Sequence, residues 1–339
     1  MHDFSSSERL LLERVQKGIP CSVVPYAEIA ASAGLTEDET LAVISSLREK
    51  QVIRNISAIF DGKSLGYTMS LVAFQVKPEN VEHAAEIINA HPGVSHNYLR
   101  SHKYNIWFTL AEVSPEEFNR SVEIIARKCH AGDFLVMRNE KLLKIGVFLD
   151  TVGSEEAYNG SEYIPAEKPA PIQLTDEEIE AVRLLQMDLP AVKRPFAEII
   201  KNSGSSMTEK RLLEHFASFI ERGVMRRYAA VLRHRNAGFI VNSMTAWKSA
   251  GEYNLEPFIG SVNVSHLYFR TVYPGRWEHP LFAMIHARSH EELDSVIKKL
   301  SSVSGIDDYL SLESVKEFKK KRVTYFSENF KKWKRLNYD

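Results

Sequence analysis

The chain has 339 residues, of which 26% are charged, and its formal net charge at pH 7 is -1. That length predicts about two domains, each long enough to bury a hydrophobic core. The near-zero charge lacks the cationic excess with which proteins bind nucleic acid or acidic membranes mainly through charge. The two cysteines, Cys21 and Cys129, are too far apart in the sequence to indicate a disulfide framework or a cysteine metal site. The sequence has no apolar leader and no run of about 18 apolar residues, so we expect a cytoplasmic protein without a membrane partner.

Three helices and a hairpin are predicted at the start of the chain, over 8–17, 26–33, 36–50 and 54–60. Pro25 suits the first position of the second helix, where no backbone N–H is needed. Thr36-Glu-Asp-Glu39 forms a capping box at the start of the third helix. Three helices followed by a wing hairpin are typical of a winged helix-turn-helix domain.

A different pattern follows. Predicted strands lie over 68–76, 94–101, 105–111 and 133–140, with predicted helices over 80–90 and 115–128. The order strand-helix-strand-strand-helix-strand is the ferredoxin-like arrangement.

Both patterns recur in the second half of the chain. Pro25-Tyr-Ala-Glu-Ile returns as Pro195-Phe-Ala-Glu-Ile, and Val52-Ile-Arg-Asn-Ile returns as Val224-Met-Arg-Arg-Tyr. A constant offset of about 170 positions indicates two similar units in tandem. We therefore predict an α+β fold, a tandem repeat of a winged helix-turn-helix domain and a ferredoxin-like domain, whose halves pair with each other. The predicted boundaries are 1–62 and 173–236 for the winged helices, 63–152 and 237–326 for the ferredoxin-like domains, 153–172 for a linker and 327–339 for a C-terminal tail.

The order of these elements resembles the leucine-responsive/AsnC-type transcription regulators, so a DNA-binding regulator is one candidate function. Such a protein should present basic or amide side chains near the start of its recognition helix. The first half has Glu37, Asp38 and Glu39 there, and the second has Glu209, Lys210 and Arg211. Together with the net charge, this sequence does not favour DNA as the partner.

Two stretches carry more specific chemistry. Ser95-His-Asn-Tyr-Leu-Arg100 and Ser265-His-Leu-Tyr-Phe-Arg270 each place a histidine two positions before a tyrosine and four before an arginine, on a predicted strand. Arginines also crowd the predicted second wing, from Arg226 to Arg235. Because arginine binds carboxylates through a two-pronged hydrogen bond, the pattern indicates a cationic, partly apolar site for a polyanion.

These stretches, together with Leu281-Phe-Ala-Met-Ile-His286, resemble the siroheme decarboxylase family over nearly the whole chain. The resemblance implies two homologous subunits fused in one chain and siroheme as substrate. It implies removal of carbon dioxide from the acetates on C12 and C18, giving 12,18-didecarboxysiroheme for heme d1 or heme synthesis. No cofactor is expected beyond the iron of the substrate, and a homodimer stays open. The chain departs from the family at Trp277-Glu-His-Pro-Leu-Phe282, where His279 replaces a tyrosine whose first-half counterpart is Tyr104.

Decarboxylation of a pyrrole acetate needs a proton donor and clamps for the other carboxylates. The candidate catalytic residues are His96, His102, His266, His279 and Tyr104. The candidate substrate-binding residues are Arg100, Arg226, Arg227, Arg235, Arg270, Tyr273 and Arg276. We predict no metal site. A heme or siroheme sensor or carrier stays open, because histidines that ligate iron and histidines that donate protons look alike in a sequence. Whether one half or both are active also stays open.

Overall fold

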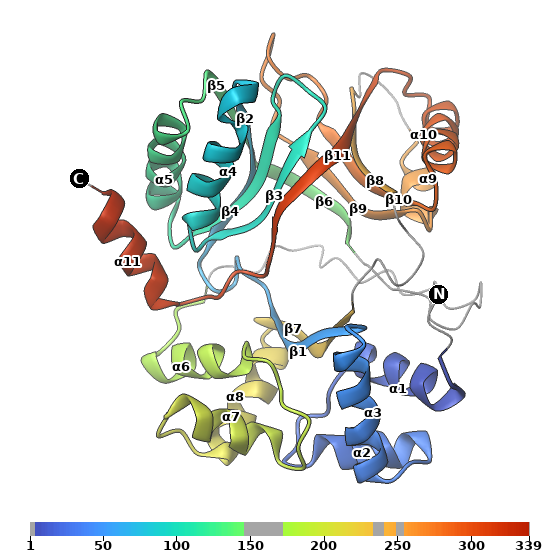
Figure 1. The fold of residues 1–339 in the computed structure, drawn as a ribbon, viewed down its shortest axis with the longest axis vertical. Helices are drawn as coiled ribbons and strands as arrows, with labels where there is room; N and C mark the ends of the chain where they lie inside the picture. Colours follow the sequence, from blue (N-terminus) through green and yellow to red (C-terminus); the bar gives the residue numbers. More distant parts are fainter. Residues whose placement is uncertain (1–3, 146–171, 233–240, 249–253, 339) are drawn as a thin grey trace.

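The computed structural model describes residues 4–145, 172–232, 241–248 and 254–338. Helix-turn-helix units from both halves lie together at one end, and a large sheet covered by helices lies at the other (Figure 1). No helix in the described ranges is long and apolar enough to cross a membrane. The predicted tandem α+β fold is confirmed.

Each helix-turn-helix unit consists of three helices and one strand. The elements are α1 (Ser6–Lys17), α2 (Pro25–Ala33), α3 (Glu37–Glu49) and β1 (Ile53–Phe60) in the first half, and α6 (Asp176–Leu185), α7 (Pro195–Ser203), α8 (Glu209–Glu221) and β7 (Met225–Leu232) in the second. The predicted capping box of α3 forms, with the Thr36 side chain accepting from the backbone N–H of Glu39. Proline begins α2 and α7, and glycine in the left-handed conformation ends both.

The prediction of a wing hairpin over 54–60 is wrong. Residues 53–60 form the single strand β1, which pairs antiparallel with β7 of the other half, so that Ile56 faces Ala230. Loops reinforce the exchange, since Leu189 N–H donates to Ile56 O (2.8 Å) and Ile19 N–H donates to Tyr228 O (2.7 Å). In a hairpin, two strands of the same half would pair their backbone groups. Here β1 and β7, one strand from each half, pair those groups with each other.

The ferredoxin-like domains follow the predicted order. The first comprises β2 (Thr68–Gln75), a short 3-10 turn (Pro78–Asn80), α4 (Val81–Ala90), β3 (Val94–Arg100), β4 (Ile106–Glu112), α5 (Pro115–Lys128) and β5 (Asp133–Met137). The second comprises β8 (Val241–Trp247), α9 (Glu256–Gly260), β9 (Val264–Arg270), β10 (Leu281–Ala287), α10 (His290–Ser304) and β11 (Tyr309–Lys320).

The last strand of each ferredoxin-like domain continues into the other. β11 pairs with β8 through its first part and with β3 through its second, while β6 (Asn139–Ile145), which follows β5, pairs with β9. The nine strands therefore form one sheet in the order β5-β2-β4-β3-β11-β8-β10-β9-β6. This reciprocal exchange covers the β3 and β9 edges and confirms that the halves pair internally.

Helices cover the outer faces of the two parts of the sheet, and the inner faces share a core. That core includes Trp107 from one half and Trp277 and Phe282 from the other. The C-terminal tail forms a helix, α11 (Glu328–Asn337), whose Trp333 is buried in the core of the first ferredoxin-like domain. Helix α11 therefore crosses from the second half back to the first (Figure 1).

Candidate functional site

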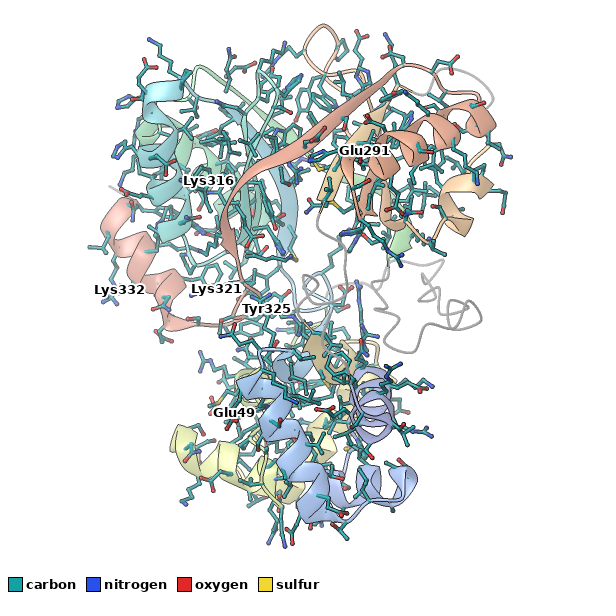
Figure 2. The ribbon with its side chains drawn as sticks, turned by 45° about the vertical axis from the view of Figure 1, so that its right-hand side comes forward. Glu49, Glu291, Lys316, Lys321, Tyr325 and Lys332 are labelled. Atoms are coloured by element: carbon teal, nitrogen blue, oxygen red, sulfur yellow. The ribbon has the colours of Figure 1, made fainter. Side chains whose placement is uncertain are left out.

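The β1/β7 ribbon separates the helical end of the molecule from the sheets. One ribbon face carries Ile56 and Tyr228 into the helical core. The alternating positions on the opposite face include Ser57 and Arg227. The chain leaving β11 passes this second face, and Figure 2 shows Lys321 and Tyr325 on that segment, between the sheets and the helices. Side chains from both halves and from the C-terminal segment therefore meet here.

His96 lies on β3 among positive charges. It faces Lys320 of β11 across the strand pair, and its Nδ1 lies 2.9 Å from the Ser95 hydroxyl. Arg54 of β1 reaches the same place and donates to the carbonyl of Lys320 (2.6 Å). Burial, followed by the charges of Lys320 and Arg54, lowers the pKa of His96 to about 4.

Two further arginines extend this group, which we call the cationic cluster: Arg54, Arg227, Lys320 and Arg322 beside His96. Burial, followed by the charges of Arg54 and Arg227, lowers the pKa of Arg322 to about 10. Within the described residues, no carboxylate lies at ion-pair distance from Arg54 or Arg322. Positive charge gathered around a histidine, with no carboxylate beside Arg54 or Arg322 in the described part of the chain, is an arrangement that binds an anion.

His266 is the second-half equivalent of His96 but has different neighbours. It faces Ile145 where His96 faces Lys320. Its Nδ1 lies 2.8 Å from the Ser265 hydroxyl, which also lies 2.9 Å from Nε2 of His286. The ring of Tyr268 stacks beside His266, as Tyr98 does beside His96.

His102, Tyr104, Arg276 and Tyr273 lie elsewhere, at the joint between the halves where β3 turns into β4. Tyr104 donates to Asp133 (2.6 Å), which also binds Arg276 through both carboxylate oxygens. Although burial alone would raise it, these bonds hold the pKa of Asp133 below its usual value. Tyr104 and Arg276, one from each half, therefore meet at Asp133 in a closed network of ion pairs and hydrogen bonds.

The remaining members of this joint are also paired. Tyr273 donates to the Val136 carbonyl (2.8 Å). His279 Nε2 lies 2.9 Å from Asp308, and strand register makes His279 the equivalent of Tyr104, as predicted. The His102 ring lies against Trp277, and burial, Lys103 and His279 lower the pKa of His102. These contacts favour a structural role for the joint, and its catalytic role stays a prediction.

The predicted carboxylate clamps on β3 and β9 contact protein groups. Arg100 donates to the Leu312 carbonyl (2.6 Å), and Arg270 donates to that of Met137 (3.0 Å). Each therefore binds a strand of the other half, Arg100 the strand β11 and Arg270 the end of β5. Burial lowers the pKa of each to about 10.

The arginines of β7 divide between two settings. Arg226 donates to Asp61 (2.6 Å), whereas Arg227 belongs to the cationic cluster. Arg235 lies outside the described residues. The sequence pattern missed three members of the cluster, Arg54, Lys320 and Arg322. The internal repeat could have revealed Arg54, because it aligns with Arg226.

Comparison with known proteins identifies the class first. The AsnC-like ligand binding domain family matches residues 64–144 and 236–319, the two ferredoxin-like units. A second family, the siroheme decarboxylase NirDL-like HTH domain, matches residues 8–54.

A siroheme decarboxylase from Hydrogenobacter thermophilus is 38% identical over 332 residues, covering 95% of this chain and 96% of that protein. The crystal structure of the siroheme decarboxylase NirDL matches with a TM-score of 0.79 at 33% identity, over 98% of both chains. A crystal structure of NirDL in complex with an iron-uroporphyrin III analogue matches with a TM-score of 0.78 at 33% identity, over 98% of this chain and 99% of that chain. The chain belongs to the siroheme decarboxylase family and is an enzyme of the carboxy-lyase class.

Proposed function

We propose that the chain removes carbon dioxide from the C12 and C18 acetates of siroheme, giving 12,18-didecarboxysiroheme, with His96 as proton donor. The observation that carries this proposal is the cationic cluster around His96, where Arg54 and Arg322 lack carboxylate partners among the described residues. A substrate with many carboxylates matches that charge. The iron-uroporphyrin III analogue bound to the similar NirDL chain is a ligand of the same class.

Each decarboxylation replaces a carboxylate by a proton. The bond between the acetate methylene and its carboxyl carbon breaks, carbon dioxide leaves, and the electron pair remains with the macrocycle and methylene carbon. A proton from an imidazolium then completes the methyl group. No oxidant or reductant is consumed, so the proposal needs no cofactor beyond the iron of the substrate.

The low pKa of His96 gives substrate binding a second effect. With a pKa of about 4, His96 is neutral at pH 7 in the free protein. The bound carboxylates oppose the charges of Lys320 and Arg54, which raises that pKa and favours uptake of a proton. The acid would therefore form when its substrate is present.

The arginines of the cluster have a different role. Arg54 and Arg227 hold carboxylates that do not react, and Arg226 and Arg235 of the second half extend this role. Holding the spectator carboxylates leaves the reacting acetate free to lose water as the site closes around it. Binding energy from the periphery of the substrate thus orients its reacting centre.

The test is anaerobic incubation of the full chain with siroheme, followed by mass spectrometry. We expect two successive losses of carbon dioxide. Binding without a change in mass would replace this proposal with a sensor or carrier, and absence of both would remove the tetrapyrrole proposal. His96→Ala, His102→Ala, His266→Ala and His279→Ala would then separate proton donors from framework, because only donors should lose turnover while siroheme still binds.

A further inference from the structure

We infer that Arg322 binds a carboxylate of the substrate, and that helix α11 is the anchor that holds Arg322 in the cationic cluster. The inference rests on the proposed function, since it concerns the same site. It adds a residue from beyond the repeated units, on a segment that has no counterpart among the described residues of the first half.

The contacts of Arg322 distinguish it from the arginines with a structural role. Its Nη1 lies 3.4 Å from the Ser57 hydroxyl and 3.5 Å from the Ala58 carbonyl, both at the limit of a hydrogen bond. Arg100, in contrast, contacts its carbonyl at 2.6 Å. A guanidinium has five N–H donors, and those of Arg322 are poorly used within the described residues. The side chain is therefore available to a ligand.

The surroundings of Arg322 favour an anionic ligand. Arg322 is accessible to solvent, yet burial and the charges of Arg54 and Arg227 lower its pKa to about 10. Among the described residues, no carboxylate lies at ion-pair distance from Arg322 itself. A substrate carboxylate would relieve this repulsion and supply a two-pronged acceptor for the guanidinium.

Hydrogen bonds to both halves hold the segment that follows Arg322. Tyr325 exchanges hydrogen bonds with the side chain of Gln186 (both 2.9 Å), and the Phe326 N–H donates to the Tyr67 hydroxyl (2.7 Å). Phe326 has a φ of 55°, a left-handed conformation that a bulky residue adopts only where its surroundings impose it. These contacts fix the course of the chain immediately after Arg322.

Helix α11 provides the second attachment. Trp333 packs its ring 4.1 Å from that of His91, which lies 3.1 Å from Glu112 in a fully buried pair. Lys334 approaches the second oxygen of Glu112 (3.4 Å) and also Glu117 (3.1 Å). The helix is thus tied to the first ferredoxin-like domain by one aromatic ring and a buried ion-pair network.

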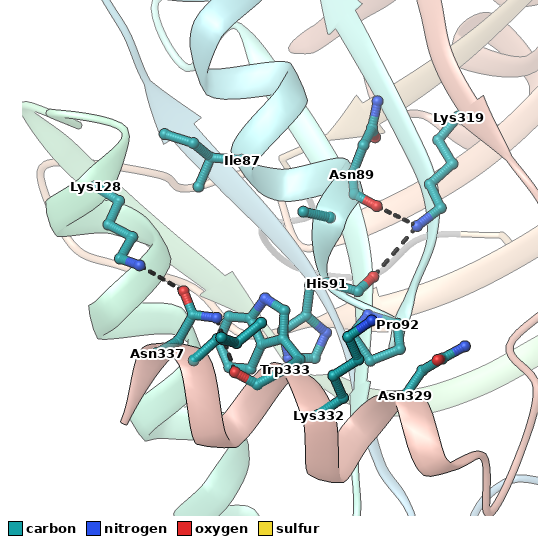
Figure 3. Close-up of a pocket in the computed structure, with 12 residues that line it drawn as sticks. Ile87, Asn89, His91, Pro92, Lys128, Lys319, Asn329, Lys332, Trp333 and Asn337 are labelled. Atoms are coloured by element: carbon teal, nitrogen blue, oxygen red, sulfur yellow. Dashed lines mark hydrogen bonds between the residues drawn. The ribbon is translucent and has the colours of Figure 1, made fainter. Parts of the chain in front are cut away.

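A pocket of about 460 Å³ lies beside Trp333, between α11 and the end of α4 (Figure 3). Lys319, at the end of β11, closes one side of the pocket by donating to the carbonyls of Asn89 and His91. Three positions further along the chain lies Arg322. The anchor and the cationic cluster are therefore joined by a short stretch of backbone.

The direct test compares Arg322→Ala with Arg335→Ala, an exposed arginine on α11 that serves as the matched control. Siroheme is titrated into each full-length variant by absorbance at about 0.1 M salt, and kcat and KM are measured. We expect Kd and KM to rise about tenfold or more for Arg322→Ala, with kcat changed less than about threefold. Arg322→Lys keeps the charge but cannot make the two-pronged hydrogen bond of a guanidinium. Its Kd and KM should therefore lie between those of wild-type protein and Arg322→Ala. An unchanged Kd for Arg322→Ala, with wild-type protein active, would overturn the inference.

The anchor is tested with Trp333→Ala and with Arg322→Ala/Trp333→Ala, alongside the melting temperature of each. If α11 acts through Arg322, Trp333→Ala raises KM, as Arg322→Ala does. The KM of the double variant should then be no higher than that of Arg322→Ala alone. Additive effects on KM would overturn the anchoring role. A wild-type chain that neither binds nor decarboxylates siroheme would instead reject the proposed function, so the two failures are distinct.

Discussion

The two halves share a framework but differ around their first histidines. Register makes Met137 equivalent to Leu312, and these carbonyls accept from Arg270 and Arg100 of the opposite halves. In the same register the pairs Tyr104–Asp133 and His279–Asp308 correspond. The framework thus has a tyrosine in one half and a histidine in the other, and each still contacts its aspartate.

A third matched contact caps helices across the halves. Lys319 Nζ donates to the Asn89 carbonyl at the end of α4 (2.7 Å), and Lys144 Nζ donates to that of Ser261 at the end of α9 (2.7 Å). An ammonium at a helix C-terminus satisfies carbonyls that have no partner in the helix and opposes the helix dipole. Each half therefore completes a helix of the other.

The differences lie one residue further along the exchanged strands. Lys320 faces His96, whereas Ile145 faces His266. His286, which contacts Ser265 beside His266, has Ala111 as its equivalent. The altered histidine neighbours are the reason why we propose proton donation by the first half.

The largest predicted effect separates the two histidines. His96→Ala should lower kcat about 100- to 10,000-fold, the range for loss of a general acid, whereas His266→Ala should lower it less than about tenfold. Single-turnover decarboxylation of siroheme, followed by mass spectrometry, measures both. Circular dichroism checks that each variant is folded, and an equal or larger loss in His266→Ala would reject the assignment.

The framework arginines should behave alike, in contrast to the histidines. Arg100→Met and Arg270→Met each leave a carbonyl of the opposite half without its donor, so each should lower the free energy of unfolding by about 1–3 kcal/mol. Denaturant titration at pH 7 measures this. If one variant is destabilised and the other unaffected, the contacts at Leu312 and Met137 are not equivalent.

The repeat allowed the fold to be predicted, because the periodicity and helix caps of each unit are local signals. Pairing between the halves could not be predicted in detail. Strand β1 pairs with β7 of the other half in place of a hairpin, and local sequence does not distinguish these two pairings. For the same reason Arg100 and Arg270 were predicted as clamps. Nothing near them in the sequence reveals that a carbonyl more than 100 residues away accepts their hydrogen bonds.

The candidate site was predicted in part. His96 and Arg227 belong to sequence motifs and do lie in the cationic cluster. Lys320 ends the last strand, β11, and Arg322 follows it, in a segment with no motif. Their position depends on β11 crossing to β3 and on α11 returning to the first half. That course depends on tertiary packing, which a pattern of residue types does not encode.

Changing Lys320→Ile gives the first half the residue of the second. We expect siroheme Kd to rise about tenfold, because one charge opposite the substrate carboxylates is lost. The pKa of His96, measured by NMR titration of the free protein, should move upward, since a neighbouring positive charge lowers it. Lys321→Ile, at an exposed lysine next along the chain, is the control and should leave both values nearly unchanged.

The last prediction is a pH dependence of stability caused by His96. Its pKa is about 4 in the folded chain and 6.5 in its ordinary state. Between these values the unfolded chain binds a proton that the folded chain does not, so stability falls as pH falls through this window. His96→Gln removes the group. Between pH 7 and pH 5, wild-type protein should therefore lose about 2 kcal/mol more stability than the variant.

Denaturant titrations of both proteins at pH 8, 7, 6 and 5 measure this difference in stability. Between pH 7 and pH 8 the difference should change little, because the imidazole is then largely neutral in both the folded and the unfolded chain. Adding Lys320→Ile to each background sharpens the test. Without that charge the folded pKa of His96 rises, so the difference between wild-type protein and His96→Gln should shrink. A difference that grows, or that has the opposite sign, would mean that Lys320 does not act on His96, and the charge contrast between the halves would lose its basis.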